Sequence, residues 1–379
     1  MLDKMPHLKI GDLIAKLPII QGGMGVGISL SKLAAAVANE GGLGVISSVG
    51  LGILHPQPGK SYQDANALAL KQEIRAARSQ TNGIIGVNIM VAISDFDEML
   101  RAAFEEEVDI VFLGAGLPLK LPSTMSLKYL QEAKSKIGII VSSARAARLI
   151  LNHWAVHFER IPDLVVVEGP KAGGHLGFKL EQIFNENFSL ERILPEVKQV
   201  VQEIHAKYQK QIPVIAAGGI FDGEQIYRAL ELGADGVQMG TRFVATDECD
   251  ADPIFKKLFV SCKKEDIIII KSPVGLPGRA IRNSFLADVS KGVRKPFVCP
   301  WKCLKTCDFN VSPYCIALAL VNARNGNMAD GFAFAGANAY MVRKITSVKS
   351  LIKDLIKEYQ DYATKISSLK GKQLQNSSN

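Results

Sequence analysis

The feature that most constrains the fold is a regular alternation of short apolar segments with helical segments over residues 18–239. The apolar segments are short and rich in valine and isoleucine, which is typical of buried parallel strands. There are eight of them, at residues 18–21, 43–47, 84–90, 110–113, 138–141, 164–167, 214–217 and 236–239.

Helical periodicity fills most of the intervals between these strands. Helices are expected at residues 30–40, 64–79, 94–106, 144–151, 190–208 and 223–232, while 51–63 is expected to be a long loop. Ser29 is the expected N-cap of the first helix, and Gly41 and Gly233 are expected to end two of them. This order predicts an α/β fold, either a (β/α)8 barrel or a doubly wound open sheet. Glycine follows many of the strands rather than one pair, which favours the barrel.

After Thr246 the alternation stops, and four units are expected along the chain: a barrel over residues 1–246, a helical appendage over the barrel mouth at 247–338, a C-terminal amphipathic helix within 339–370, and a disordered tail at 371–379. In the appendage, 272–283 reads as a Pro/Gly loop, and 311–325 and 330–342 as small-residue helices. The last helix is expected at 348–369. Its apolar residues are spaced three and four apart, so it is expected to pack on the barrel rather than on a membrane. They are Leu351, Ile352, Leu355, Ile356 and Tyr359.

Composition narrows the classes of function. Hydrophobic residues make up 47% of the 379 residues, enough for a large core, and the net charge of +8 is concentrated near the C-terminal helix. Basic residues are not interleaved with aromatic ones, which argues against nucleic-acid binding. No apolar run is long enough to be a signal peptide or to span a membrane. We therefore expect a cytoplasmic protein that acts on a small molecule and that can form a homodimer.

The segment 164–177 combines a buried strand with a glycine-rich loop. Glu168 ends the strand, and Gly173 and Gly174 would let backbone N–H groups approach a ligand closely. His175 follows directly, and its imidazole can exchange a proton near neutral pH. The simpler interpretation is a tight turn with an exposed histidine.

The ends of the last two strands resemble a phosphate site. Two adjacent strand ends can offer backbone N–H groups and a hydroxyl to an anion, although each is also compatible with an ordinary turn. The residues are Ala217, Gly218, Gly219, Gln238, Met239, Gly240 and Thr241. Asn88 and Gln21 are polar residues in apolar strands, so each faces a cofactor ring or makes an internal hydrogen bond. Met24 would form an apolar wall or pack within its loop.

These motifs together resemble the nitronate monooxygenase family, once called 2-nitropropane dioxygenases, which includes the flavin-dependent enoyl-acyl-carrier-protein reductase II. They are 18–24 (PIIQGGM), 86–90 (GVNIM), Glu168 with 172–177 (AGGHLG), 213–222 (PVIAAGGIFD) and 240–243 (GTRF). The resemblance implies an FMN-binding TIM barrel with Gly218, Gly219, Gly240 and Thr241 around the phosphate. It places Gln21, Gly22, Gly23, Met24, Asn88 and Glu168 around the ribityl chain and ring, and makes His175 the catalytic residue.

The resemblance leaves two reactions open. A nitronate monooxygenase passes electrons from an alkyl nitronate through the flavin to oxygen, with His175 orienting or deprotonating a nitroalkane. An enoyl-thioester reductase uses NADH or NADPH to reduce the flavin, which then reduces the substrate. A third possibility, from another class, is a non-catalytic barrel that binds a phosphorylated ligand.

Two features depart from the family pattern. The segment 178–188 lengthens the connection after His175. In the appendage, Cys299, Cys303, Cys307 and Cys315 are spaced so that the first three would lie near one face of a helix. They form either an iron–sulfur or zinc site, or a set of buried free thiols. Arg279 and Arg282 would bind an anionic substrate or fasten their loop.

Overall fold

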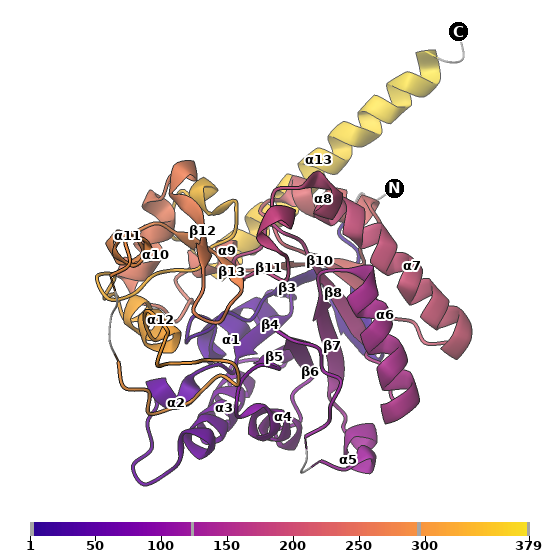
Figure 1. Cartoon of the computed structure of the whole chain (residues 1–379). Helices are drawn as coiled ribbons and strands as arrows, with labels where there is room; N and C mark the ends of the chain where they lie inside the picture. Colours follow the sequence, from indigo (N-terminus) through magenta and orange to yellow (C-terminus); the bar gives the residue numbers. More distant parts are fainter. Residues whose placement is uncertain (1–3, 123–124, 294–296, 377–379) are drawn as a thin grey trace.

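A computed structural model describes residues 4–122, 125–293 and 297–376 of the chain. Eight parallel strands form its central sheet, in the order β3-β11-β10-β8-β7-β6-β5-β4 (Figure 1). They are β3 (Ile19–Gln21), β4 (Gly44–Ser47), β5 (Ile85–Met90), β6 (Ile110–Gly114), β7 (Lys136–Val141), β8 (Leu164–Glu168), β10 (Val214–Ala217) and β11 (Gly236–Met239). Leu43 joins the first strand to the second, because its N–H donates to Ile19 O and its carbonyl accepts from Gln21 N, both at 2.9 Å. The prediction of a (β/α)8 barrel is confirmed.

Side chains fill the interior of the barrel. Phe112 occupies its centre and is about 1% exposed. Glycine stands beside it on each neighbouring strand, since a Cβ at Gly86 would lie 2.8 Å from the Phe112 ring and one at Gly138 would lie 3.0 Å from it. The ring therefore fits because both neighbours lack a side chain, as close packing requires.

Seven helices follow the first seven strands on the outside of the barrel. They are α1 (Ser31–Asn39), α3 (Tyr62–Arg78), α4 (Phe96–Glu105), α5 (Leu127–Glu132), α6 (Ala144–His153), α7 (Leu190–Tyr208) and α8 (Gly223–Glu231). The first of them is not capped by Ser29 as expected, because the Ser29 hydroxyl bonds to Met24 N. Carboxylates of Asp250 and Glu73 accept from the N–H groups of Leu30 and Ser31 instead. A short helix, α2 (Leu51–Leu54), lies within the segment expected to be a loop, and a π-helical turn (Trp154–Phe158) extends α6.

The eighth helix of the barrel is the C-terminal one, α13 (Val348–Asn376). It packs between α8 and α1 and buries Leu351, Ile352, Leu355 and Tyr359, while its far end projects from the body (Figure 1). The helix continues through 376, so the disorder expected from residue 371 is not found there; residues 377–379 lie outside the described part. Everything between β11 and α13 is thus an insertion into the last strand-to-helix connection.

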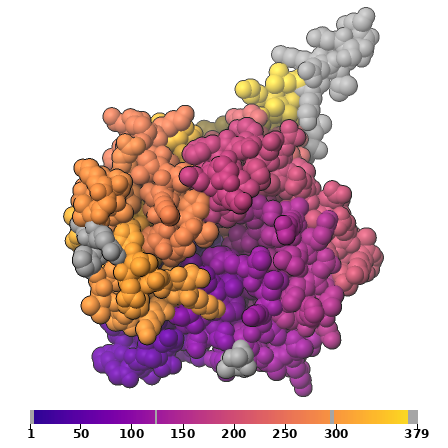
Figure 2. Space-filling model, in the orientation of Figure 1, coloured from indigo at the N-terminus to yellow at the C-terminus, as the bar shows by residue number. Residues whose placement is uncertain are grey.

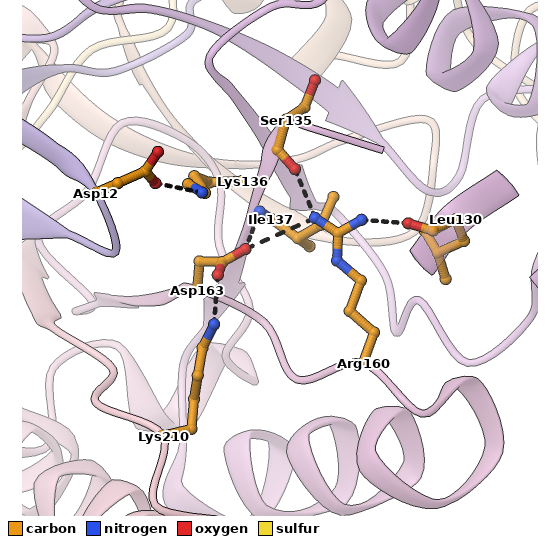
Figure 3. A network of polar contacts seen from close by, with 8 residues as sticks. All are labelled: Asp12, Leu130, Ser135, Lys136, Ile137, Arg160, Asp163 and Lys210. Atoms are coloured by element: carbon orange, nitrogen blue, oxygen red, sulfur yellow. Dashed lines mark hydrogen bonds and ion pairs between the residues drawn. The ribbon is translucent and has the colours of Figure 1, made fainter. Parts of the chain in front are cut away.

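A hairpin, β1 (Leu8–Ile10) and β2 (Leu13–Ala15), covers the amino-terminal end of the barrel. A polar network lies at the same end (Figure 3). Asp163 accepts from Ile137 N at 2.9 Å and pairs with Lys210 at 2.6 Å, while Arg160 donates to the carbonyls of Leu130 and Ser135. These contacts join loops that carry no predicted site residue, which assigns this end of the barrel to stability.

The appendage, which is drawn in orange in Figure 2, covers one side of the barrel. It contains α10 (Pro253–Ser261), β12 (Ile267–Lys271), β13 (Pro277–Ile281), α11 (Ser284–Ser290) and α12 (Ile316–Arg324), whereas α9 (Thr241–Val244) precedes it, directly after β11. Single 3-10 turns occur at Leu180–Gln182, Glu186–Phe188, Lys264–Asp266 and Ala339–Met341. No helix in the described ranges is both long and apolar enough to cross a bilayer.

Two predictions for this region are wrong. The segment 272–283 is not a loop, because 277–281 forms the second strand of a hairpin with β12. The segment 330–342 is not a helix apart from the turn Ala339–Met341, since Phe334 pairs with Ala280 as extended backbone. The appendage is therefore mixed α and β rather than wholly helical. Residues 278 and 279 also pair with His175 and Gly174, so both segments have pairing partners distant in sequence, about which local periodicity carries no information.

Candidate functional site

A cavity of about 660 Å³ opens at the carboxyl ends of the barrel strands, between the barrel loops and the appendage. Its wall brings together all but one of the predicted site residues, which come from the ends of five barrel strands. Those that line it are Gly22, Gly23, Met24, Asn88, Glu168, Gly173, Gly174, His175, Ala217, Gly218, Gly219, Gln238, Met239, Gly240 and Thr241.

The exception is Gln21, which lies behind the cavity wall and is fully buried. Its Oε1 accepts from Val45 N at 3.0 Å, and its Nε2 donates to Val45 O at 3.2 Å and to Gly22 O at 2.5 Å. The side chain thus bonds to both backbone groups of a residue on β4, across the seam where the barrel closes. The sequence left two interpretations of Gln21, a contact with a cofactor ring or an internal hydrogen bond, and the structure shows internal hydrogen bonds.

One end of the cavity presents backbone N–H groups that have no protein acceptor among the described residues. Gly218 and Gly219 follow β10 with φ values of +90° and +91°, a conformation that favours glycine and turns the chain tightly. Among the described residues, the backbone N–H groups of Gly219, Gly240 and Thr241 donate to no protein acceptor. Free N–H groups at two adjacent strand ends are the usual donors to a phosphate.

Sequence reasoning missed several residues at this end. Lys171 is the only cation that lines the cavity among the described residues, and its side chain lies against Gly219, where a Cβ would meet it at 2.8 Å. Asn338 Nδ2 donates to Gly219 O at 2.7 Å, and Gly336 N donates to Thr241 Oγ1 at 3.1 Å. Lys171 lies within the glycine-rich stretch, so its position in the sequence could have indicated a role in the site. Asn338 lies in a segment predicted to be helical, and no sequence pattern marked it as a site residue.

The other end of the cavity suits a flat ring. A Cβ at Gly23 would lie 2.4 Å from the Asn88 Cβ, so glycine lets this loop pass directly over the amide-bearing strand. Met24 borders Gly240, with its sulfur 3.3 Å from the position of a Cβ there. Burial raises the pKa of Glu168, at the end of β8, to about 7. The wall here combines close backbone approach, a thioether and polar groups.

His175 faces the cavity from β9 (Gly174–His175), a two-residue strand. Its Nε2 lies 2.7 Å from the Ser272 Oγ, and its ring packs edge-to-face on Phe334 at 5.0 Å. Burial lowers the pKa of His175 to about 4, so the imidazole is neutral at neutral pH. A neutral imidazole in a cavity accepts protons more readily than it donates them.

The appendage fastens the loop that carries His175. Strand β13 pairs antiparallel with β9, matching Gly278 to His175 and Arg279 to Gly174. The Arg279 Nη1 donates to the carbonyls of Pro170 and Ala172, both at 2.6 Å, and burial lowers its pKa to about 10. Arg279 therefore fastens the loop rather than binding substrate. Arg282 is exposed and does not line the cavity.

The segment 178–188 contributes nothing to the cavity wall, since no residue between Gly177 and Ala217 lines it. Phe178 and Ile183 pack into the core, while Phe184 is 77% exposed. The lengthened connection therefore leaves the arrangement around His175 intact.

The four appendage cysteines do not lie on one helix face, because Cys299, Cys303 and Cys307 precede α12 in irregular backbone. They and Cys315 are free thiols that border a second cavity, of about 300 Å³. In the described part of the chain, no three His, Cys, Asp or Glu side chains are placed to hold one metal ion. The sequence left open a zinc site or an iron–sulfur site. A site for a single zinc ion lacks a set of ligands among the described residues.

Comparison with known proteins identifies the group to which the chain is similar. The family model described as "Nitronate monooxygenase" matches residues 8–358. A probable nitronate monooxygenase of Staphylococcus aureus strain Newman is 30% identical over 303 residues, covering 74% of this chain and 79% of that protein.

Solved structures agree with the sequence comparison. FabK from Thermotoga maritima has a TM-score of 0.71 and 28% identity, with 93% of this chain and 95% of FabK covered. Nitroalkane oxidase from Streptomyces ansochromogenes shares the fold, with a TM-score of 0.68 and 23% identity. The alignment covers 93% of this chain and 98% of the oxidase. Since the family model spans nearly the whole length, the chain belongs to the nitronate monooxygenase family and is an oxidoreductase.

Proposed function

We propose that the chain binds FMN in the large cavity and uses it to oxidise alkyl nitronates with oxygen. The observation that carries this proposal is the meeting of an anion site and a neutral imidazole on one cavity wall. Bound FMN would supply two-electron oxidation of the substrate and subsequent transfer to oxygen. Gly218, Gly219, Gly240 and Thr241 would bind its phosphate, with Lys171 adding a positive charge.

The ring would lie toward Gly22, Gly23, Met24, Asn88 and Glu168, with backbone approach also from Gly173 and Gly174. Ala217, Gln238 and Met239 complete the wall between the two ends. These positions fit a flat group because glycine has no Cβ, which leaves room beside its backbone. At Gly174 the position that a Cβ would take has no heavy atom within 4 Å.

His175 would accept the α-proton of a neutral nitroalkane or hold a nitronate oxygen through a hydrogen bond. Its pKa of about 4 keeps it unprotonated at neutral pH, so a ring nitrogen is available to accept, but it also makes the imidazole a weaker base than an ordinary histidine. Ser272 fixes the ring orientation through its contact with Nε2. The non-catalytic alternative does not agree with membership of an enzyme family.

Reduction of an enoyl thioester by NADH or NADPH is the second candidate. The observation in its favour is the apolar part of the cavity, which the appendage extends with Leu276, Ile316, Leu320 and Phe334. A small alkyl nitronate does not need so long an apolar wall, whereas an acyl chain does. Small-molecule chemistry, a cytoplasmic location and a homodimer remain predictions that accompany either candidate.

The test is flavin reduction followed by visible absorption under anaerobic conditions. We expect the purified protein to carry FMN, and nitronate to bleach it faster than NADH or NADPH. In His175→Ala the rate with a neutral nitroalkane should fall about 100-fold or more, and the rate with preformed nitronate should fall less, because proton transfer is already complete.

His157→Ala is the matched control, since His157 is an exposed histidine that packs against the ring of His153 and does not line the cavity. Bleaching by a nicotinamide, reversed by an enoyl thioester, would establish the second candidate instead. Failure of the flavin-free chain to bind added FMN would contradict both.

A further inference from the structure

The four cysteines of the appendage share one small cavity. Cys299, Cys303, Cys307 and Cys315 border a space of about 300 Å³ together with Lys302, Lys305 and two phenylalanines, Phe297 and Phe309. The lining contains two cations and no carboxylate.

The backbone holds this segment in place without helix or disulfide. Leu304 pairs with Ile93 as an isolated antiparallel bridge. Cys303 O accepts from Ser94 N at 3.1 Å, and Lys305 N donates to Ala92 O at 3.0 Å. The cysteines therefore stand on a loop fastened to the β5–α4 connection, and the pocket is preformed.

The geometry distinguishes between kinds of metal group. One ion needs several ligands at a single point, and the described residues contain no such set. A cubane of four irons gives each thiolate its own iron, so its ligands stand around a volume instead of a point. Four thiols bordering one cavity match that requirement.

Charge points the same way. Thiols lose their protons when they bind iron, and Lys302 and Lys305 in the lining would offset the thiolate charge that results.

We propose that Cys299, Cys303, Cys307 and Cys315 bind a four-iron iron–sulfur cluster. Its site touches the large cavity, because Cys303, Leu304 and Ile316 line both spaces. The cluster would thus lie one side chain away from the proposed flavin cavity, a place suited to an electron-transfer centre. This inference depends on the cysteine pocket alone and not on the proposed substrate.

The experiment is anaerobic reconstitution of the full chain with iron and sulfide, followed by metal and labile-sulfide analysis and by electron paramagnetic resonance after dithionite reduction. We expect about four irons and four sulfides per chain and a resonance from the reduced cluster. Cys299→Ser and Cys307→Ser should each lose at least one iron and the resonance of the intact cluster.

Cys262→Ser is the matched control, because Cys262 is a buried appendage cysteine outside the pocket whose thiol donates only to Phe259 O. It should retain the full iron and sulfide content. Equal iron in the control and in a Cys299→Ser/Cys307→Ser double variant would mean adventitious iron and overturn the proposal. So would zinc without sulfide, or no metal uptake by a chain that binds FMN normally.

Discussion

At the scale of single residues, one carboxamide completes the barrel. Between β3 and β4 the backbone pairing is confined to Leu43, and Gln21 supplies the next two hydrogen bonds with its side chain. A fully buried polar side chain is expensive unless it is paired, and here both ends of the amide are paired. The residue looked like a ligand contact in the sequence because its apolar surroundings are the same in either role.

Gln21→Leu should lower the free energy of unfolding by about 2–4 kcal/mol. The leucine has similar volume but leaves the N–H and C=O of Val45 buried without partners. Urea denaturation measures the change, with the exposed Gln202→Leu on α7 as the control, which should remain within about 0.5 kcal/mol of the wild type. An unaltered midpoint in Gln21→Leu would show that the seam does not need the side chain.

Glu168 and His175 have pKa values displaced in opposite directions on the same cavity wall. Burial raises the pKa of Glu168 from 4.5 to about 7 and lowers that of His175 from 6.5 to about 4. Both side chains are therefore largely neutral near pH 6. Pairs displaced in this way are frequent where acid–base chemistry occurs.

Glu168→Gln should stabilise the flavin-free protein increasingly as the pH rises. Between pH 4.5 and 7 the native state holds a proton on Glu168 that the unfolded state has lost, so wild-type stability declines through this window and the glutamine variant avoids the decline. The difference between the two proteins should grow by about 1–3 kcal/mol between pH 4.5 and 7.5. Melting temperatures across that range measure it.

Glu181→Gln provides the control, because Glu181 is exposed in the segment after His175. Its difference from the wild type should not change with pH. A constant difference for Glu168→Gln as well would mean that water reaches the carboxylate and keeps its pKa ordinary.

At the scale of elements, a hairpin from the appendage holds the loop that carries His175. Between β8 and the 3-10 turn that begins at Leu180, the loop has no regular structure except the two residues of β9, and these pair with β13. Arg279 adds two hydrogen bonds to the carbonyls of Pro170 and Ala172. His175 therefore takes its position from the appendage as much as from the barrel.

Arg279→Lys should weaken FMN binding about tenfold while leaving the barrel folded. An ammonium is a more strongly hydrated charge than a guanidinium and lacks its planar geometry, so burial costs more and the two carbonyls are held less well. Loss of one such hydrogen bond to a charged donor is worth about 1.5 kcal/mol, close to a factor of ten. Fluorescence titration of the flavin-free protein measures the dissociation constant.

Arg282→Lys is the control on the same hairpin, and it should bind FMN as the wild type does, since its side chain does not line the cavity. If both lysine variants bound FMN equally, the loop would owe its position to strand pairing alone.

The elements also show what a single sequence can and cannot reveal. Local hydrophobic periodicity predicts buried strands such as β8 and amphipathic helices such as α7, and the expected bounds of both lie close to those in the structure. The cavity residues followed because carboxyl ends of parallel strands meet at one face. The pairing of β13 with β9 and the contacts of Ser272 and Asn338 depend on partners about a hundred residues away, which local patterns do not encode.

At the scale of the whole molecule, closure of the barrel depends on a helix far from its strand. The appendage separates β11 from α13, yet α13 takes the place of the eighth barrel helix. Gly223, at the start of α8, lets the two helices touch, since a Cβ there would lie 2.2 Å from Tyr359 N. The appendage is therefore held at both ends by the barrel, and the cavity between them should persist only while α13 is docked.

Tyr359→Ala should lower the free energy of unfolding by about 3–5 kcal/mol. Tyr359 is fully buried and its ring lies 5.5 Å from that of Tyr227, so truncation leaves a cavity between α13 and α8. FMN fluorescence and far-ultraviolet circular dichroism should report one common transition, because undocking α13 releases the barrel and the appendage together. Gln360→Ala, on the exposed face of the same turn, should change little. Equal losses in the two variants would mean that α13 is stabilised by its own helicity and that barrel closure does not require its buried face.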